Sequence, residues 1–404
     1  MEILYFGTMC SEQMENQILK ITKSTGNVAQ NNLERALMNE LIKIKQYSIS
    51  AYCIPCMPYE VLGQHRYMVS RKDMVFENFY TQTYSVMKIP IVKYMSYFFQ
   101  TIKYIKKWMK NSRKDEKRII YITVNFVPVS FAISFMKKIY KYKTVAMVSD
   151  LAKDQYADNR IKEFKFLRRC SIPFYNKVAQ ILEKNHDGFI FLSKAMNCIN
   201  KDNKPYAVME GIFNNNLTFK EYRHRENVIL YAGALNEKYG IGKILEIMKK
   251  LTNIDVTLEI YGDGAYKSKI LEQSKKDKRI VYKGFVTREE LFDRMQKVKV
   301  LVNLRDPRMN YTKYSFPSKM FEYMASGTPV LTTRLEGIPE EYYEFVYSID
   351  GYDTAKIANK LKEILEKDNM ELTQLGSKAR EFILNKKTSK NQVNQVIQII
   401  ENIG

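Results

Sequence analysis

The sequence predicts an α/β fold made of two Rossmann-like, doubly wound domains. Short apolar strands alternate with helical patterns along almost the whole chain, which is the order expected for parallel sheets covered by helices on both faces. The length of 404 residues also suits two domains better than one. A mostly polar stretch at 214–226 interrupts the alternation. We therefore place the domain boundary near residue 215.

The predicted first domain covers residues 1–215. Runs of β-branched and aromatic residues predict strands at 3–6, 48–54, 118–124, 144–148, 189–192 and 206–209. Apolar residues at helical spacing predict helices over 27–45 and 129–140, and a long loop is expected between the first strand and residue 26. The uncharged run 119–136 is close to the length of a membrane helix, but its polar residues and Pro128 favour a strand, a turn and a helix.

The predicted second domain covers residues 216–385 and repeats the same alternation. Strands are expected at 228–232, 256–261, 279–282 and 300–304, with helices at 240–251, 265–274 and 288–298. A last helix is expected at about 392–402, within the terminal segment 386–404.

The segment 313–331, KYSFPSKMFEYMASGTPVL, is the most informative part of the chain. Ser315 and Pro317 predict a helix start, because a short hydroxyl can cap free amides and proline suits the first turn. Gly327 predicts the helix end. Glu322 is the one acid in an otherwise mostly apolar helix. Amides at a helix start bind anions, and a carboxylate accepts from hydroxyls, so the segment favours an anionic, hydroxyl-rich ligand.

This segment resembles the donor-binding segment of retaining glycosyltransferases of family 4, which have the GT-B architecture. Its variant at 314–319 and 321–327 is similar to transferases that build bacterial capsules and exopolysaccharides. The resemblance implies two domains that face each other across a cleft. The acceptor would bind to the first domain and the nucleotide sugar to the second, and residues 386–404 would return toward the first domain. It also implies a nucleotide diphosphate sugar as donor, with no cofactor and no essential metal.

The resemblance implies roles for single residues. Family members usually carry an arginine and a lysine that bind the donor diphosphate. Lys238 matches the lysine, but Ala234 stands at the arginine position. We therefore expect Lys319 or Arg305 to supply the missing cation. Glu322 matches a glutamate that contacts ribose, whereas Tyr314 replaces a second glutamate. The predicted catalytic residues are Lys238, Lys319 and Glu322, and the predicted donor-binding residues are Gly233, Gly262, Gly284, Arg305, Tyr314, Ser315, Phe316, Pro317 and Ser318.

Three residues of the first domain are predicted on the acceptor side: Gly26, Asp150 and Glu210. Ligands of open α/β sheets bind beyond the carboxyl ends of the strands, and Asp150 and Glu210 each follow a predicted strand. Gly26 precedes a predicted helix, where backbone can approach a phosphate. Asp150 also shares four-residue spacing with Asp154 and Asp158. Carboxylates at that spacing usually line a solvated face, so no metal site is predicted.

Charge suggests the partners. Lys and Arg outnumber Asp and Glu by 65 to 44, which gives a net charge of +21 and suits an anionic membrane, phosphorylated substrates or nucleic acid. No nucleic-acid-binding motif is present, so nucleic acid is not expected.

In 90–118, apolar residues 91, 95, 98, 102, 105 and 109 form one stripe, which fits either a core-packing helix or a helix lying on an anionic inner leaflet. Five cysteines do not suggest a disulfide framework.

These observations favour a cytoplasmic glycosyltransferase that associates peripherally with the inner face of the membrane. It would move a sugar, with retention, from a nucleotide diphosphate sugar to a lipid-linked oligosaccharide or polysaccharide acceptor in bacterial surface polysaccharide synthesis. Two alternatives stay open. The absent arginine and glutamate at Ala234 and Tyr314 suit a non-catalytic GT-B partner subunit. A GT-B epimerase would act on the nucleotide sugar itself and would need no acceptor.

Overall fold

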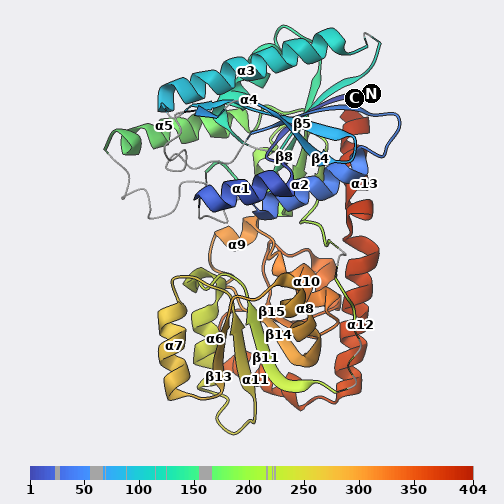
Figure 1. The fold of residues 1–404 in the computed structure, drawn as a ribbon. Helices are drawn as coiled ribbons and strands as arrows, with labels where there is room; N and C mark the ends of the chain where they lie inside the picture. Colours follow the sequence, from blue (N-terminus) through green and yellow to red (C-terminus); the bar gives the residue numbers. More distant parts are fainter. Residues whose placement is uncertain are drawn as a thin grey trace. The chain divides into compact units, whose positions relative to one another are not determined.

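The structure is a computed structural model that describes residues 1–22, 28–54, 67–68, 70–87, 89–113, 115–123, 125–153, 166–214, 217–220, 222 and 224–403. The chain forms two compact units (Figure 1). The first unit contains Met1–Leu192, Met196–Met209 and Gln392–Gly404, and the second contains Ser193–Ala195 and Glu210–Asn391. The break after Met209 lies slightly before the boundary predicted near residue 215, and the end of the chain groups with the first unit.

The first unit is built on an eight-stranded sheet with the strand order β10-β9-β8-β7-β1-β2-β5-β4. Its strands are β1 (Glu2–Gly7), β2 (Ser48–Cys53), β4 (Lys72–Phe76), β5 (Phe79–Thr83), β7 (Arg118–Ile122), β8 (Lys143–Val148), β9 (Gly188–Phe191) and β10 (Tyr206–Val208). Neighbouring strands are parallel except β4 and β5 at one edge. Strands β3 (Tyr67–Met68) and β6 (Val86–Met87) form a separate antiparallel pair. The strand order reverses between β1 and β7, which is the switch point of this sheet.

The helices of the first unit are α1 (Glu12–Thr22), α2 (Val28–Leu41), α3 (Pro90–Asn111), α4 (Val127–Met136), α5 (Phe166–Leu182), the 3-10 helix η3 (Lys194–Ile199) and α13 (Ser389–Ile403). Figure 1 shows α3, α4 and α5 on one side of the sheet and α1 and α2 on the other. The expected long loop after the first strand was wrong, because α1 occupies much of it. Ser11 starts this helix by accepting a hydrogen bond from the Met14 amide at 3.1 Å.

Helix α3 buries one face, and the apolar stripe noted in the sequence lies only partly on that face. Its most buried residues are Tyr97, Thr101, Tyr104, Ile105 and Trp108. Met95, which the predicted stripe included, is 49% exposed. Ile105 of the stripe is buried, and aromatic rings line the same buried face: Tyr97 packs 5.3 Å from the Tyr84 ring, and Trp108 packs 6.3 Å from the Tyr142 ring.

The uncharged run 119–136 forms β7 and α4, as predicted. Within the described part of the chain, no helix is both long enough and apolar enough to cross a membrane.

The second unit has a parallel six-stranded sheet with the order β13-β12-β11-β14-β15-β16. Its strands are β11 (Glu226–Ala232), β12 (Thr257–Tyr261), β13 (Ile280–Gly284), β14 (Val298–Asn303), β15 (Val330–Thr333) and β16 (Tyr347–Ile349). Its helices are η4 (Glu237–Tyr239), α6 (Ile241–Met248), α7 (Lys267–Lys276), α8 (Arg288–Lys297), α9 (Tyr311–Tyr314), α10 (Lys319–Ala325), η5 (Glu340–Glu344), α11 (Thr354–Glu366) and α12 (Asn369–Lys386). The strand order reverses between β11 and β14.

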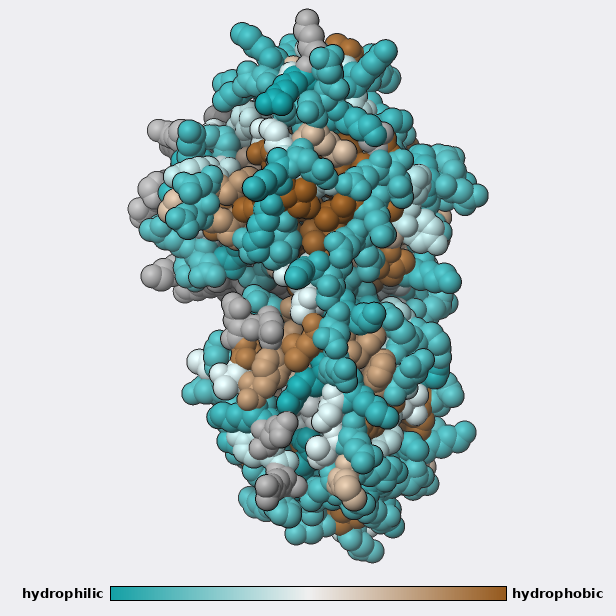
Figure 2. Space-filling view, turned by 90° about the vertical axis from the view of Figure 1, so that its right-hand side faces the viewer, coloured by the Kyte–Doolittle hydropathy of each residue, from teal (hydrophilic) through white to brown (hydrophobic). Residues whose placement is uncertain are grey.

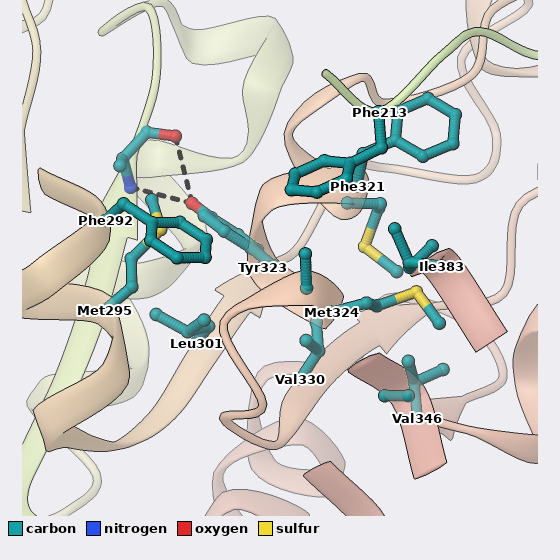
Figure 3. Close-up of a cluster of buried hydrophobic side chains, with 14 of the residues drawn as sticks. Phe213, Phe292, Met295, Leu301, Phe321, Tyr323, Met324, Val330, Val346 and Ile383 are labelled. Carbon is teal, nitrogen blue, oxygen red and sulfur yellow. Dashed lines mark hydrogen bonds between the residues drawn. The ribbon is translucent and has the colours of Figure 1, made fainter. Parts of the chain in front are cut away.

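Both faces of the second sheet are packed. Along β11, Val228, Leu230 and Ala232 join one hydrophobic cluster, and Ile229 and Tyr231 join another. Because successive side chains of a strand point to opposite faces, the two clusters lie on opposite sides of the sheet. Figure 3 shows part of the first cluster, with side chains from α8, α10 and α12 gathered together.

The molecular surface is mostly hydrophilic in the view of Figure 2, in keeping with the net charge of +21. Apolar side chains nevertheless gather at the surface in the middle of the first unit, the upper one in that view.

Candidate functional site

Four of the predicted residues lie at one edge of the second sheet. Gly233 follows β11, Gly262 follows β12, Gly284 ends β13 and Arg305 follows β14. These strands are parallel neighbours, so their carboxyl ends meet at the same edge. The Gly233 amide donates to the Tyr261 carbonyl at 3.1 Å, and the Gly262 amide donates to the Gly284 carbonyl at 2.8 Å. Ligands bind at this edge in open α/β sheets, nearest the switch point between β11 and β14.

Glycine is required where these loops touch. Gly262 has φ +128°, and a Cβ there would lie 1.9 Å from the Gly233 carbonyl oxygen. Gly240 has φ +85°, and a Cβ there would lie 1.7 Å from the Leu304 carbonyl oxygen. Any larger residue would push the loops apart. The loop 233–240 is thereby held closely against the ends of β12 and β14.

Tyr323 ties helix α10 to the same edge. Its hydroxyl donates to the Ala232 carbonyl at 2.9 Å and accepts from the Ala232 amide at 2.8 Å (Figure 3). The side chain is 1% exposed, and burial raises its pKa. The segment 313–331 therefore positions the loop after β11.

Two cations flank the Tyr239 ring at the switch point. The Lys238 Nζ lies 5.1 Å from the ring centre, and the guanidinium carbon of Arg305 lies 4.9 Å from it. Among the described residues, no carboxylate or hydrogen-bond acceptor pairs with the Arg305 side chain. Burial lowers the pKa of Arg305, but a guanidinium remains charged in proteins. Arg305 therefore places a cation beside the loop that contains Ala234, and its role as a substitute for the missing arginine stays a prediction.

Glu322 is ionised and doubly paired. Its side chain is 16% exposed and accepts from Lys319 Nζ at 2.5 Å and from Arg288 Nε at 2.8 Å. Burial raises the pKa of Glu322, but the charge and hydrogen bond of Lys319, with those of Arg288, lower it by more, so the net shift is downward. Lys319 is therefore neutralised within the protein, in contrast to Arg305.

Arg288 was missed by the sequence analysis. It is the first residue of α8, shortly after β13, whose carboxyl end lies at the same edge of the sheet. That position was the available signal, because a cation in a loop at this edge is well placed to bind an anion.

The predicted helix start at Ser315 was wrong. The Ser315 hydroxyl donates to the Tyr311 carbonyl at 3.1 Å at the end of α9. Helix α10 begins later, and Ser318 at its N-cap makes no capping bond through its side chain. The predicted helix therefore corresponds to α10, which starts two residues after Pro317, and α9, which ends just before Ser315, was not predicted.

The other residues of the predicted donor-binding loop have mixed surroundings. Phe316 is 8% exposed, and its ring lies 4.8 Å from Phe321 and 5.0 Å from Tyr342. Its side chain therefore packs in the core. Pro317 is buried and Tyr314 is partly exposed. Their contacts with a donor stay predictions.

The three predicted acceptor-side residues have different surroundings in the described part of the chain. Gly26 lies outside the described residues. Asp150 is exposed and follows β8 at its carboxyl end. Glu210 belongs to the second unit, where its carboxylate accepts from the Tyr342 hydroxyl at 2.7 Å and from Lys387 Nζ at 2.5 Å. Such a buried ion pair has a structural role, and acceptor contacts of these three residues stay predictions.

Glu34 lies at the switch point of the first sheet and was not predicted. It is 1% exposed on α2 and accepts from the Thr8 amide at 2.7 Å and the Thr123 hydroxyl at 2.6 Å, which follow β1 and β7. Burial raises its pKa. The available signal was an acid on the buried face of an amphipathic helix, at helical spacing from Leu37 and Leu41.

The described residues contain no cluster of three or more His, Cys, Asp or Glu side chains that could hold a metal. Of the three spaced aspartates, Asp154 and Asp158 lie outside the described residues.

The comparisons with known proteins agree with this arrangement. Residues 214–382, less than half of the chain, match the family described as glycosyl transferases group 1. No curated protein matches the chain. Among solved structures, sucrose-phosphate synthase from Thermosynechococcus elongatus is 14% identical with a TM-score of 0.65, over 100% of this chain and 99% of that one.

Two further structures are similar over the whole chain. The lipopolysaccharide outer core galactosyltransferase WaaB, in its apo form, is 11% identical with a TM-score of 0.62, over 100% of this chain and 99% of that one. Anabaena HepE in complex with UDP is 13% identical with a TM-score of 0.62, over 100% of both chains. At such identities these structures establish the fold, and the matched family establishes the type of enzyme. The chain is therefore a glycosyltransferase with the GT-B fold, and residues 214–382 match the glycosyl transferases group 1 family.

Proposed function

We propose that this glycosyltransferase moves a sugar, with retention of the anomeric configuration, from a nucleotide diphosphate sugar to a lipid-linked oligosaccharide or polysaccharide acceptor. Its setting would be bacterial surface polysaccharide synthesis. The observation that carries the donor assignment is the pair of cations, Lys238 and Arg305, beside Tyr239 at the switch point of the second sheet. Fixed positive charges at this position suit a diphosphate and stabilise the charge that develops on it as it leaves.

The rest of the edge suits the nucleoside. Glu322 uses one hydrogen bond on each carboxylate oxygen, whereas a carboxylate offers about four acceptor positions. The unused positions are available to ribose hydroxyls. A Cβ on Gly284 would meet no atom within 4 Å, so there is space beside it. A complex of Anabaena HepE with UDP-glucose supports testing uridine diphosphate sugars first.

The proposed mechanism needs no covalent nucleophile. The enzyme would align the acceptor hydroxyl with the donor, while Lys238 and Arg305 stabilise the departing nucleotide phosphate. We propose that these two cations neutralise the diphosphate and that no cofactor or essential metal is required. If Arg305 supplies this cation, as we propose, the absent arginine at Ala234 is no longer a motive for a non-catalytic subunit.

The acceptor assignment places the enzyme at the membrane. We propose that the first unit binds the acceptor, that the second binds the donor, and that the protein is cytoplasmic and associates with the anionic inner face of the membrane. The net charge of +21 supports this location, because anionic headgroups attract basic surfaces. We expect no nucleic acid partner.

Donor binding is tested by thermal shift with UDP-, GDP- and ADP-sugars, because a ligand that binds the folded state raises the apparent stability. We expect one nucleotide class to raise the Tm of the wild type. Arg305→Ala should abolish this shift. Arg308→Ala is the matched control, since Arg308 lies in the same loop with a side chain 77% exposed and paired with Asp306.

A compensating variant separates loss of charge from loss of structure. Ala234→Arg, added to Arg305→Ala, should restore part of the shift, because it returns a cation to the loop after β11. Transfer of labelled sugar to lipid-linked acceptors is then measured with the donor so identified. Nucleotide binding without transfer to any acceptor, or no nucleotide binding at all, would contradict the proposed function.

A further inference from the structure

We infer that the outward faces of α3 and α4 form a docking surface for an anionic phospholipid bilayer. The inference rests on the proposed function in one respect: a lipid-linked acceptor gives the enzyme a reason to sit on a membrane. The surface itself is defined by exposed apolar side chains, ring contacts and charge within the first unit.

An apolar patch runs across the two helices. Its exposed members on α3 are Val92 (39% exposed), Met95 (49%) and Phe99 (58%). Those on or just after α4 are Phe131 (51%), Phe135 (45%) and Ile139 (60%). Phe98 joins the two rows, because its ring centre lies 5.3 Å from Phe99, 5.8 Å from Phe131 and 6.3 Å from Phe135. Single exposed apolar residues are ordinary, whereas a contiguous patch marks an interaction site.

The patch is flanked by cations. On α3 the exposed face changes from apolar to basic along the helix, and its second half carries Lys103, Lys106, Lys107 and Lys110, all exposed. Phe99, Lys103, Lys106 and Lys110 follow one another at helical spacing, so the apolar and basic parts share one face.

A basic hollow lies at the end of α4. It has a volume of about 540 Å³ and is lined by Glu116, Lys117, Arg118, Lys137, Tyr140, Lys141, Tyr142 and Lys143. Asp187 pairs with Lys137 at 2.6 Å and with Lys143 at 3.7 Å, and Glu116 pairs with the amino terminus. Lys117, Lys141 and Arg118 have no carboxylate partner among the described residues, and the Arg118 Nε is buried without a hydrogen bond. The hollow therefore suits the phosphate of a lipid headgroup.

This combination favours a bilayer over other partners. Cores of protein interfaces are poor in lysine, and nucleic acid does not require a row of exposed aliphatic and phenyl side chains. At a bilayer surface, phenylalanines enter the acyl boundary while lysines reach the anionic headgroups. Apolar and basic parts of the face then act together.

The test is co-sedimentation of the full chain with phosphatidylcholine vesicles, with and without phosphatidylglycerol. We expect binding only to the anionic vesicles. Phe99→Ser combined with Phe131→Ser should weaken binding roughly tenfold or more, from the lost burial of two rings. Lys117→Glu combined with Lys141→Glu should weaken it by at least roughly fivefold per lysine, and more at low salt.

Matched controls lie on the second unit. Leu271→Ser with Met370→Ser changes residues that are 41% and 69% exposed, and Lys250→Glu with Lys356→Glu reverses two exposed lysines. These controls should bind vesicles as the wild type does. Absence of binding to anionic vesicles, or equal losses in the controls, would overturn the inference. Self-association that the phenylalanine variants abolish, without vesicle binding, would assign the face to a second copy instead.

The vesicle assay is independent of the donor assay. If nucleotide sugars shift the Tm but vesicles do not bind, the docking surface is wrong and the donor assignment stands. If vesicles bind in the predicted pattern but no nucleotide sugar does, the proposed function fails and the docking surface stands.

Discussion

At the residue scale, the chemistry of this chain depends on which cations and acids have partners. Lys319 and Arg305 were equal candidates for the missing arginine by sequence. The structure separates them, because Lys319 is 2.5 Å from Glu322, whereas Arg305 lies against Tyr239 and pairs with no carboxylate in the described part of the chain. Sequence spacing places a residue on a loop, but it does not say which neighbours the fold brings to that side chain. For this reason Arg288 and Glu34 were not predicted.

His186 gives a prediction for pH at this scale. It is 6% exposed with an unpartnered Nδ1, and burial, together with the charge of Lys137, lowers its pKa to about 4. In the unfolded chain the histidine pKa is about 6.5. Between about pH 4 and pH 6.5 the unfolded chain therefore binds more protons than the folded one. We therefore expect stability to be lost as the pH falls from about 6.5 toward 4, by about 2 kcal/mol at pH 5.

Denaturant unfolding of the wild type and His186→Phe across this pH range measures the effect. The variant removes the titrating group and keeps a ring in contact with Phe189, which lies 6.2 Å from the imidazole. Its stability should depend less on pH than that of the wild type. Identical pH profiles for the two proteins would rule out His186 as the source.

At the scale of elements, the sequence predicted most strands and helices because their apolar periodicity is strong. The four strands predicted at 228–232, 256–261, 279–282 and 300–304 lie close to β11, β12, β13 and β14, since β-branched runs bounded by polar residues leave few alternatives, whereas β16 was not predicted. The errors have local causes. Helix α1 was expected as a loop although Met14, Ile18 and Ile21 recur at helical spacing after the Ser11 cap, and the buried face of α3 carries aromatic rings that a pattern weighted toward aliphatic residues does not capture. The strands β4 and β5 were missed because their side chains are mainly polar or exposed.

Helix α10 offers a test of how an element positions the site. Tyr323→Phe removes both hydrogen bonds to Ala232, and each unsatisfied buried group costs about 1–3 kcal/mol. We expect lower stability and also weaker nucleotide binding, because the loop 233–240 loses its fixed position. Both quantities are read from denaturant unfolding and from nucleotide titration of the folded protein.

Tyr343→Phe is the control for this prediction. Like Tyr323, Tyr343 bonds both backbone groups of one residue: its hydroxyl accepts from the Leu335 amide at 2.8 Å and donates to the Leu335 carbonyl at 3.1 Å. These bonds do not involve the loop after β11. It should reduce stability to a similar degree without changing the nucleotide Kd. Equal effects of both variants on nucleotide binding would mean that Tyr323 acts only through global stability.

At the scale of the whole molecule, the end of the chain is shared between the two units. Helix α12 belongs to the second unit, whereas Gln392–Gly404 groups with the first. Within the first unit, the Tyr47 hydroxyl donates to Glu401 at 3.1 Å, and a Cβ on Gly188 would lie 2.9 Å from Ile399. Helix α13 therefore packs at the beginnings of β2 and β9. The apolar spacing of residues 392–402 predicted the position of this helix, but its partners follow from long-range packing that no local pattern encodes.

Two isoleucines test this division. Ile400 on α13 and Ile383 on α12 are each 0% exposed, in the first and second units respectively. Replacing either with alanine should cost about 2–5 kcal/mol of local stability, from lost burial and the cavity left behind. Only Ile383→Ala should lower the stability of the unit that binds nucleotide, because Ile383 packs in the cluster that contains Tyr323 and Leu230.

Calorimetry with and without nucleotide distinguishes the two variants. Ile400→Ala should leave the Tm of the nucleotide-sensitive transition unchanged, whereas Ile383→Ala should lower that Tm. If both variants lowered that transition equally, the two units would unfold as one, and α13 would stabilise the whole molecule and not the first unit alone.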